Sequence, residues 1–191
     1  GMPKGVMWRH EDVFFTLGGG FDIDGNAVAS PLTLAERAAE GFNLTYFVLP
    51  PLMHGAGQWG SLRSLFEGHT IVLSPAASFD PEAAWQTVAD ARVNVIIATG
   101  DAMARPLVET LAADPTRFDT SSLLAFGSTA AIFSRAVKNQ FFELMPNIVL
   151  TDSIGSTETG FSGLAQVTKD TDMKAGPTVV PGAETIVVDD D

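Results

Sequence analysis

The sequence contains no cysteine among its 191 residues. This absence excludes a disulfide framework, cysteine-bound zinc, an iron–sulfur cluster and a thiol nucleophile, and it agrees with a cytoplasmic protein. Positive charge is also scarce, since 11 Lys and Arg residues stand against 23 Asp and Glu residues and give a formal net charge of −12. A chain this acidic repels nucleic-acid backbones, so we expect no nucleic acid among its partners.

Long apolar runs are missing as well. No run approaches the roughly 18 residues that a membrane helix needs, and the first residues lack the basic and then apolar pattern of a secretory signal. We therefore expect no membrane span and a cytoplasmic location. With 46% hydrophobic and 18% charged residues, the chain can bury one sizeable core. Assembly into a homo-oligomer is compatible with this composition.

Five short apolar runs recur along the chain, and each is followed by a turn signal. They occupy residues 46–49, 71–73, 93–98, 123–126 and 148–150. Continuous apolar runs are typical of strands that are covered on both faces, and the spacing leaves room for a helix between consecutive strands.

Helix signals fall between these runs. Asp80 precedes a proline, Asp101 precedes a periodic apolar pattern, and Ser134 precedes another, so each is expected to cap a helix. Alternating strands and helices predict an α/β fold with a largely parallel β-sheet flanked by helices. Residues 18–34, rich in Gly and Asp and including Ser30 and Pro31, are expected to form a flexible loop. Both ends of the chain look cut, and the first two residues could also be a tag remnant.

Ligands of parallel sheets bind beyond the carboxyl ends of the strands. This rule selects residues 50–57, 99–101, 127–130 and 152–160 as candidate site segments. The last is the densest in hydroxyl groups and glycines, and it carries one carboxylate. From its residues alone it is either a phosphate-binding and cation-binding loop or a solvated polar turn. Residues 1–5, with a lysine between glycines, are either a phosphate-contacting segment or a surface loop.

Four segments in this order resemble motifs of the adenylate-forming superfamily, which includes acyl-CoA synthetases, peptide-synthetase adenylation domains and luciferases. Residues 1–6 resemble the end of its phosphate loop, and residues 51–57 resemble its Pro-x-Phe/Met-His-x-x-Gly segment. Residues 126–130 lie where the family has its adenine-side loop, and residues 154–158 are similar to Tyr-Gly-x-Thr-Glu. The resemblance covers the whole chain, and it implies a central fragment, residues 1–191, of the large N-terminal domain of a fatty-acid or steroid-acid CoA ligase.

The resemblance implies roles for five residues along the phosphate chain of ATP. Lys4, with the backbone of Gly1 and Gly5, would lie along the β- and γ-phosphates. Thr157 would hydrogen-bond the α-phosphate, and Glu158 would hold Mg²⁺ beside it.

Six further residues are implied to surround the nucleotide: Gly127, Ser128, Thr129, Ile154, Gly155 and Ser156. The first three would form one wall of the adenine and acyl site. Ile154 stands where the family has a tyrosine, so the ring that usually stacks on adenine is absent and purine packing is apolar here.

The resemblance also implies a substrate pocket bordered by His54, Gly57 and Trp59. His54 would separate the acyl pocket from the channel for the thiol of coenzyme A. From the residues alone, this histidine could instead donate one hydrogen bond within a wall.

The implied activity is activation of a carboxylic acid with ATP to an acyl-adenylate, followed by transfer to coenzyme A as a thioester. The fragment alone is expected to be inactive, because the family's ribose-binding aspartate, hinge and C-terminal lysine lie beyond Asp191. Two alternatives stay open. One is a non-catalytic relic or interaction module of the same fold, and the other is an acyl-AMP ligase that loads a carrier protein.

Overall fold

The computed structural model describes residues 5–19, 30–41, 43–74, 76, 78–172 and 179–181. A seven-stranded sheet runs through them in the order β2-β1-β3-β4-β5-β6-β7. Its strands are β1 (Thr45–Val48), β2 (Thr70–Leu73), β3 (Val95–Ala98), β4 (Ala125–Thr129), β5 (Val149–Ser156), β6 (Gly160–Val167) and β7 (Val180–Pro181). Strands β1 to β5 are parallel, and β6 and β7 add to the sheet in antiparallel pairing. The predicted largely parallel α/β sheet is therefore confirmed.

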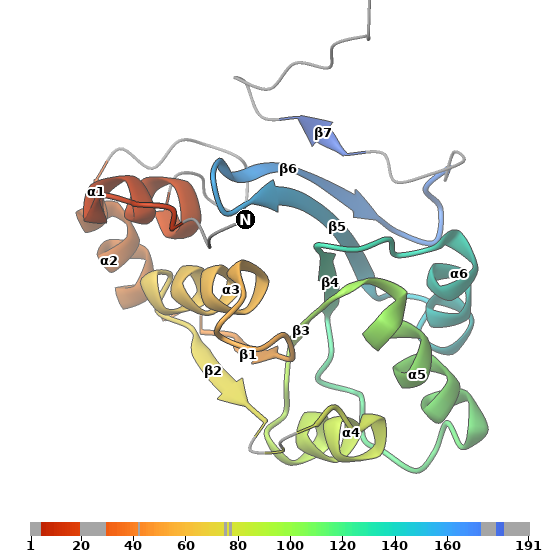
Figure 1. Cartoon of the computed structure of the whole chain (residues 1–191). Coiled ribbons are helices and arrows are strands. Elements are labelled where there is room, and N and C mark those ends of the chain that lie inside the picture. The colour runs from red at the N-terminus through yellow and green to blue at the C-terminus, as the bar shows by residue number, and fades with distance from the viewer. Residues whose placement is uncertain are drawn as a thin grey trace, which may run out of the picture.

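Helices cover both faces of the sheet (Figure 1). One face carries α4 (Pro81–Asp90), α5 (Gly100–Ala113) and α6 (Arg135–Leu144). The other carries α3 (Gly55–Phe66), which contacts β1, β2 and β3 and packs against the π-helix η1 (Phe14–Gly19). The short helix α1 (His10–Val13) leads into η1, and α2 (Pro31–Ala39) precedes β1.

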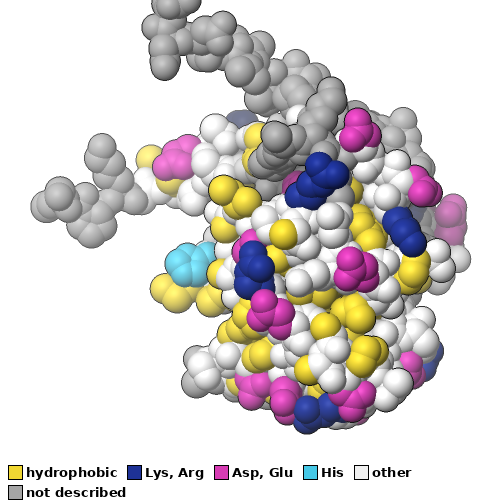
Figure 2. Space-filling view, turned by 90° about the vertical axis from the view of Figure 1, so that its right-hand side faces the viewer, with side chains coloured by type: hydrophobic (Ala, Val, Ile, Leu, Met, Phe, Trp, Pro, Cys, Tyr) yellow, Lys and Arg dark blue, Asp and Glu magenta, His cyan; other side chains and the backbone are white. Residues whose placement is uncertain are grey.

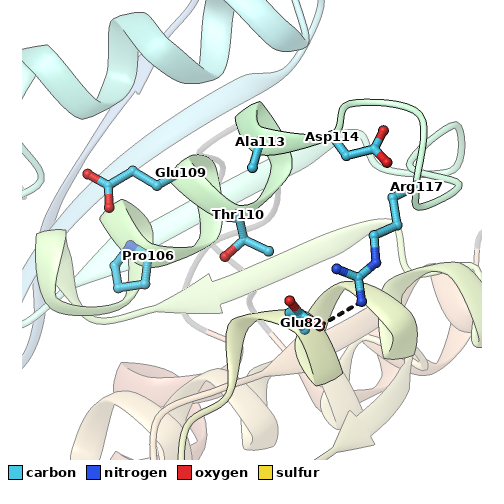
Figure 3. Close-up of a pocket in the computed structure, with 7 residues that line it drawn as sticks. All are labelled: Glu82, Pro106, Glu109, Thr110, Ala113, Asp114 and Arg117. Atoms are coloured by element: carbon cyan, nitrogen blue, oxygen red, sulfur yellow. Dashed lines mark hydrogen bonds and ion pairs between the residues drawn. The ribbon is translucent and has the colours of Figure 1, made fainter.

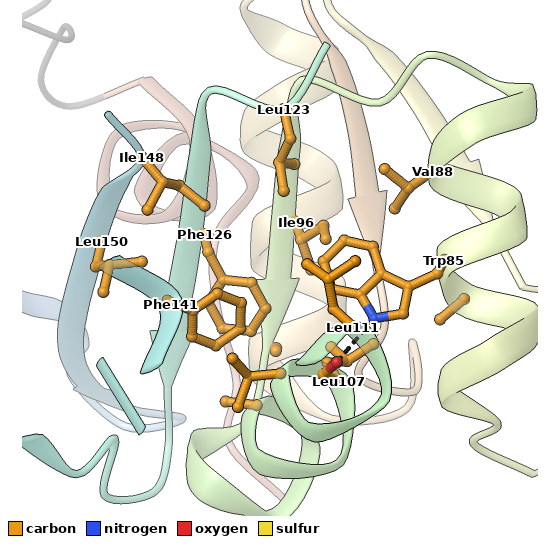
Figure 4. Packing of buried hydrophobic residues seen from close by; sticks show 14 of the residues in the cluster. Trp85, Val88, Ile96, Leu107, Leu111, Leu123, Phe126, Phe141, Ile148 and Leu150 are labelled. Carbon is orange, nitrogen blue, oxygen red and sulfur yellow. Dashed lines mark hydrogen bonds between the residues drawn. The ribbon is translucent and has the colours of Figure 1, made fainter. Parts of the chain in front are cut away.

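The main core lies between the sheet and helices α4 to α6 (Figure 4). Trp85 of α4 is fully buried, and its indole N–H donates a 2.8 Å hydrogen bond to the carbonyl of Leu107 on α5. Phe126 of β4 packs against Phe141 of α6 with ring centroids 4.7 Å apart. These large buried rings hold the three helices against the sheet by hydrophobic burial, the main favourable term in folding.

The five predicted strands all form, with shifts at their ends. The run 93–98 pairs only from Val95 onward, and the last predicted strand extends well beyond residue 150. Strands β6 and β7 were not predicted. Strand β6 has the sequence GFSGLAQV, in which buried and exposed residues are mixed. It therefore lacks the continuous apolar run by which the parallel strands could be predicted.

Two of the three predicted helix caps are confirmed. The Asp80 carboxylate accepts from the backbone N–H groups of Glu82 and Ala83, and the Ser134 hydroxyl accepts from the N–H of Val137. The third was wrong, because α5 begins at Gly100 and Thr99 is its N-cap, so Asp101 lies inside the first turn.

The loop expected over residues 18–34 differs at both ends from the structure. Residues 18 and 19 end η1, and α2 begins at Pro31. The hydroxyl of Ser30 accepts from the N–H of Leu32, and proline at the first helical position suits a helix start, so Ser30 and Pro31 begin a helix instead of continuing a loop. Residues 20–29 lie outside the described part of the chain.

The surface over α5 and α6 mixes charges of both signs with exposed apolar side chains and gathers no basic patch (Figure 2). Across the described ranges, no helix combines the length and the hydropathy that crossing a membrane would require.

Candidate functional site

The carboxyl ends of β1 to β5 meet at one edge of the sheet, because these strands are parallel. The segments that follow β1, β3 and β4, and the distal part of β5, therefore lie along this edge. Residues 1–4, which include Gly1 and Lys4, lie outside the described residues, whereas Gly5 is described and exposed.

The segment expected as a loop over residues 152–160 is instead the end of a β-hairpin. Strand β5 continues to Ser156, a turn covers residues 157–159, and β6 returns from Gly160. Gly155 is needed here, because a Cβ at this position would lie 2.4 Å from the carbonyl oxygen of Gly160 across the hairpin. The antiparallel partner β6 converts the predicted loop into paired strand, and this partner could not be seen in the local sequence.

Hydroxyl groups hold the turn together from within. The Ser156 hydroxyl accepts from the N–H of Thr159 at 3.2 Å and lies 3.0 Å from the Thr159 hydroxyl, which in turn is 3.2 Å from the hydroxyl of Ser162. The Ser156 side chain, expected to face the nucleotide, is thus engaged in the turn. Thr157 and Glu158 are exposed at its tip.

A contact that sequence reasoning missed joins this tip to the start of the chain. The indole N–H of Trp8 donates a 2.8 Å hydrogen bond to the carbonyl oxygen of Thr157, across 149 positions of sequence. Gly5, the last residue of the glycine–lysine segment, is three residues before Trp8. Trp8 itself can be noticed in the sequence, but its hydrogen-bond partner could be identified only from the fold.

The end of β4 presents alternate residues to opposite faces of the sheet. The Ser128 hydroxyl is buried and accepts from the N–H of Gly100 at the start of α5. Its side chain therefore faces the α5 side of the sheet. The expected place of Ser128 in one wall of the adenine and acyl site stays a prediction. Gly127 and Thr129 face the opposite side by strand alternation.

Helix α3 lies on the face that carries Gly127. Ile97 of β3 pairs in register with Gly127, and a Cβ at Gly60 of α3 would lie 2.8 Å from the Ile97 Cδ1 atom. Next to Gly127 in β5 lies Thr151, whose hydroxyl would be 3.0 Å from a Cβ at Gly127. Small side chains therefore line this face between α3 and the β5–β6 hairpin.

The three residues expected at the substrate pocket lie at the start of α3. His54 is the N-cap residue and is exposed, without a side-chain capping bond. Trp59 is half-buried and lies against Gly55, where a Cβ would be 3.3 Å from the indole. Gly57 is buried, and a Cβ there would lie 2.4 Å from the carbonyl oxygen of Pro50, so glycine allows α3 to pack closely on the preceding loop.

A buried ion pair joins strand β5 of the hairpin to helix α6, on the face of the sheet opposite α3. Lys138 of α6 and Asp152 of β5 pair through their side chains, which are 5% and 9% exposed. The Lys138 ammonium also lies 5.1 Å from the centre of the Phe133 ring, within reach of a cation–π contact. Nothing in the linear sequence marked either residue as paired, because the two come from different elements.

The loop after β4 is tied to the start of α5. Asp101 accepts from the backbone N–H of Ser134 at 2.8 Å and pairs with Arg105 at 2.7 Å. Burial acts to raise the pKa of Asp101, but the hydrogen bonds from Ser134 and Arg105 outweigh it, and the pKa lies below its ordinary value. The carboxylate is thus held charged as a structural clamp between α5 and α6.

Two partly buried groups with shifted pKa values, His69 and Tyr46, lie at the opposite edge of the sheet. His69 precedes β2, and its Nδ1 accepts from the N–H of Leu44 at 3.3 Å, while its ring stacks on Tyr46. Burial lowers the pKa of His69 and raises the pKa of Tyr46 to about 12. Their position at the amino ends of the strands indicates a structural role.

One surface pocket lies between α4 and α5, with a volume of about 400 Å³ (Figure 3). It contains none of the expected site residues, and the ion pair between Arg117 and Glu82, at 2.6 Å, closes one side of it. Within the described ranges, no three or more His, Asp or Glu side chains converge as a metal site would require.

Comparison with protein families finds one match that spans the chain. The model for "AMP-binding enzyme" matches residues 1–191. Among curated relatives, a medium/long-chain-fatty-acid–CoA/3-oxocholest-4-en-26-oate–CoA ligase of Mycolicibacterium smegmatis is 45% identical over 195 residues, covering 100% of this chain and 35% of the relative. A 3-oxocholest-4-en-26-oate–CoA ligase of Rhodococcus rhodochrous is 43% identical over 196 residues, again covering 100% of the chain and 35% of the relative. The chain thus spans about a third of the length of these relatives.

Solved structures show the same fold at lower identity. The nonribosomal peptide synthetase FmoA3 superposes with a TM-score of 0.63 at 18% identity, covering 82% of this chain and 18% of that one. A luciferase-like enzyme from the mealworm Zophobas morio gives a TM-score of 0.57 at 16% identity, covering 70% of this chain and 30% of that one.

Proposed function

Because the chain belongs to the family of AMP-binding enzymes, we propose that it forms the central part of the nucleotide-binding domain of an ATP-dependent acid–CoA ligase. The observation that carries this proposal is the exposed turn with Thr157 and Glu158, which the Trp8 hydrogen bond joins to the segment that follows Gly5. The activity belongs to a longer protein, since the chain spans 35% of its ligase relatives, and we expect the 191-residue chain alone to be inactive.

We assign the phosphate chain of ATP to the space between these two segments. The Thr157 hydroxyl would donate to an oxygen of the α-phosphate, and the backbone of Gly5, together with Gly1 and Lys4, would lie along the β- and γ-phosphates. Backbone N–H groups of a glycine-rich segment bind phosphate without net positive charge on the protein, which suits a chain with net charge −12.

Glu158 is the proposed ligand for Mg²⁺. A nucleotide-bound Mg²⁺ takes one or two protein carboxylates and completes its octahedron with phosphate oxygens and water. One exposed carboxylate at the tip of the hairpin fits this need. When bound, the cation would neutralise negative charge that builds up on the phosphate oxygens.

The proposed reaction has two steps. A carboxylate oxygen of the acid attacks the α-phosphorus, the bond to the β-phosphate oxygen breaks, and pyrophosphate leaves. The thiol of coenzyme A then loses its proton and its sulfur attacks the acyl carbon, the bond from that carbon to the phosphate oxygen breaks, and AMP leaves with the oxygen. In the first step Thr157 holds the α-phosphate in place, so that the attacking oxygen and the leaving group are aligned. No nucleophile from the protein is required, which agrees with the absence of cysteine.

The acid is proposed to lie on the face between α3 and the hairpin, beside Gly127, Thr129 and Thr151. In this proposal His54 and Trp59 at the start of α3 would border the acid. Adenine would pack on the exposed side chain of Ile154, which is 46% exposed. By similarity to the named ligases, a medium-chain or long-chain fatty acid or a steroid acid is the proposed substrate class. The proposed compartment is the cytoplasm.

Product formation by the longer protein tests this proposal. The protein should form acyl-CoA from ATP, coenzyme A and fatty or steroid acids, and Glu158→Gln should lower the rate about 100-fold. Glu143→Gln is the matched control, because Glu143 is an exposed glutamate of α6, and it should leave the rate unchanged. Product formed on a carrier-protein thiol alone would favour the carrier-loading alternative, and no product from a folded protein would favour the non-catalytic one.

A further inference from the structure

Trp8 is the half-buried residue of the segment Gly5–Glu11. From Gly5 to Glu11, every residue is exposed except Trp8. Its neighbour Met7 is 97% exposed. The segment therefore does not pack as a whole, and the indole of Trp8 fixes where it lies.

The partner of Trp8 is placed at the most exposed end of the hairpin. Residues 154–159 are all exposed, so little packing holds this end against the body of the protein. Hydroxyl bonds among Ser156, Thr159 and Ser162 give the turn a defined shape, but they all lie within the hairpin and cannot fix its position relative to other segments. The hydrogen bond from the Trp8 indole does so at the carbonyl of Thr157.

A second contact keeps the same segment beside the same strand. The π-helix η1, which follows α1 in the chain, contacts β6 of the hairpin and also packs against α3. Trp8 and η1 thus attach residues 5–19 to the hairpin at two separate places. The first attachment is the 2.8 Å hydrogen bond from Trp8 to the carbonyl of Thr157, the residue that precedes Glu158.

From this geometry we infer that Trp8 is a positioning residue for nucleotide activation. Its indole N–H holds the carbonyl of Thr157 and so sets the spacing between Gly5 and the turn that carries the Thr157 hydroxyl and the Glu158 carboxylate. This inference rests on the proposed function, because that function places the phosphate chain of ATP between Gly5 and the turn. The indole does not touch the reacting atoms, and it acts through Thr157 and Glu158.

Phenylalanine at position 8 is the appropriate test, because it keeps an aromatic ring and removes the N–H donor. In the longer protein, Trp8→Phe should lower kcat/KM for MgATP in acid-dependent ATP–pyrophosphate exchange by about 10-fold, since small misplacement of reacting groups is costly. It should also raise the Mg²⁺ concentration that gives half-maximal rate, because the Glu158 carboxylate is less well held. The KM for the acid should not change.

The chain supplies a matched control at Trp85. Its indole also donates a 2.8 Å hydrogen bond to a backbone carbonyl, that of Leu107, but inside the core between α4 and α5. Trp85→Phe therefore removes the same type of bond far from the hairpin. We expect it to lower the urea midpoint more than Trp8→Phe does, and to leave kcat/KM for MgATP and the Mg²⁺ dependence unchanged.

An NMR measurement reports on the hydrogen bond directly. Of the indole N–H signals of the 15N-labelled chain, the one that disappears in Trp8→Phe belongs to Trp8. It should shift when MgATP is added, whereas the signal lost in Trp85→Phe should not.

These measurements distinguish a failure of the Trp8 role from a failure of the proposed function. Exchange by the wild-type protein with unchanged kinetics in Trp8→Phe would overturn the role of Trp8 alone, and so would equal losses in the Trp8 and Trp85 variants. Absence of exchange in the folded wild-type protein would overturn the proposed function and this inference with it.

Discussion

The buried ion pair between Lys138 and Asp152 is expected to hold the site strand β5 on helix α6, and replacing one partner alone should be costly. The two residues are 4% and 6% exposed, so neither charge can turn to water when its partner is removed. Asp152 pairs in register with Ser128 of β4 and Ala165 of β6, which places it in the interior of the sheet. Loss of one partner from a buried pair costs about 3–5 kcal/mol of unfolding free energy.

The double replacement should behave differently from the single ones. Lys138→Met leaves a buried carboxylate without its cation, and Asp152→Leu leaves a buried ammonium without its anion. Each should lower the unfolding free energy by about 3–5 kcal/mol, whereas Lys138→Met/Asp152→Leu removes both charges and should lie within about 1 kcal/mol of the wild-type chain. The nearby Phe133 and Leu150 provide an apolar environment for the new side chains.

Urea unfolding followed by circular dichroism and by tryptophan fluorescence measures this cycle. Trp85, fully buried in the core, is a sensitive reporter of global unfolding. Costs below about 1 kcal/mol for both single variants would contradict this prediction, because the pair would then not be desolvated as the structure has it. A double variant as unstable as the sum of the single ones would refute it as well, since no coupling between the two charges would remain.

Three further predictions concern single sites. Burial lowers the pKa of His69 below its ordinary value of 6.5, so the unfolded chain binds the proton more tightly than the folded one. The urea midpoint should therefore fall as the pH drops below about 6.5. This dependence of the midpoint on pH should be weaker in His69→Gln and unchanged in His54→Gln. The Ser61 hydroxyl is buried and has no hydrogen-bond partner among the described residues, so Ser61→Ala should raise the unfolding free energy by about 1 kcal/mol. Ser64→Ala, which loses a 2.8 Å bond to the carbonyl of Gly60, should not, and calorimetry of both variants decides this. Ile154→Tyr should tighten ATP binding by the longer protein about 2–10-fold by stacking on adenine, as measured by titration calorimetry, and an unchanged or weaker affinity would place adenine elsewhere.

The parallel part of the fold could be predicted from the sequence because its strands are short apolar runs, and helices cover both faces of the sheet that they form (Figure 1). Runs such as residues 46–49 and 148–150 are apolar without interruption, and turn residues mark their ends. Helix caps at Asp80 and Ser134 were predictable for the same local reason, since the capping side chain and its N–H partners lie within one turn.

The hairpin and its contacts could not be predicted in this way. Residues 152–160 contain glycines and hydroxyl groups that suit either a loop or a tight hairpin, and the choice depends on β6 as an antiparallel partner. The bond from Trp8 to Thr157 spans 149 positions and the pair of Lys138 with Asp152 joins a helix to a strand, so both depend on the assembled fold. The direction of the Ser128 side chain, which faces α5, likewise could not be predicted from its place in a sequence motif.

The central proposal is that the tip of the β5–β6 hairpin and the N-terminal segment together activate an acid with ATP. Acid-dependent exchange of labelled pyrophosphate into ATP, measured on the longer protein without coenzyme A, tests the first step alone. We expect exchange with fatty or steroid acids and a loss of about 100-fold in Glu158→Gln. A folded wild-type protein that binds ATP and shows no exchange with short-chain, long-chain or steroid acids would contradict it.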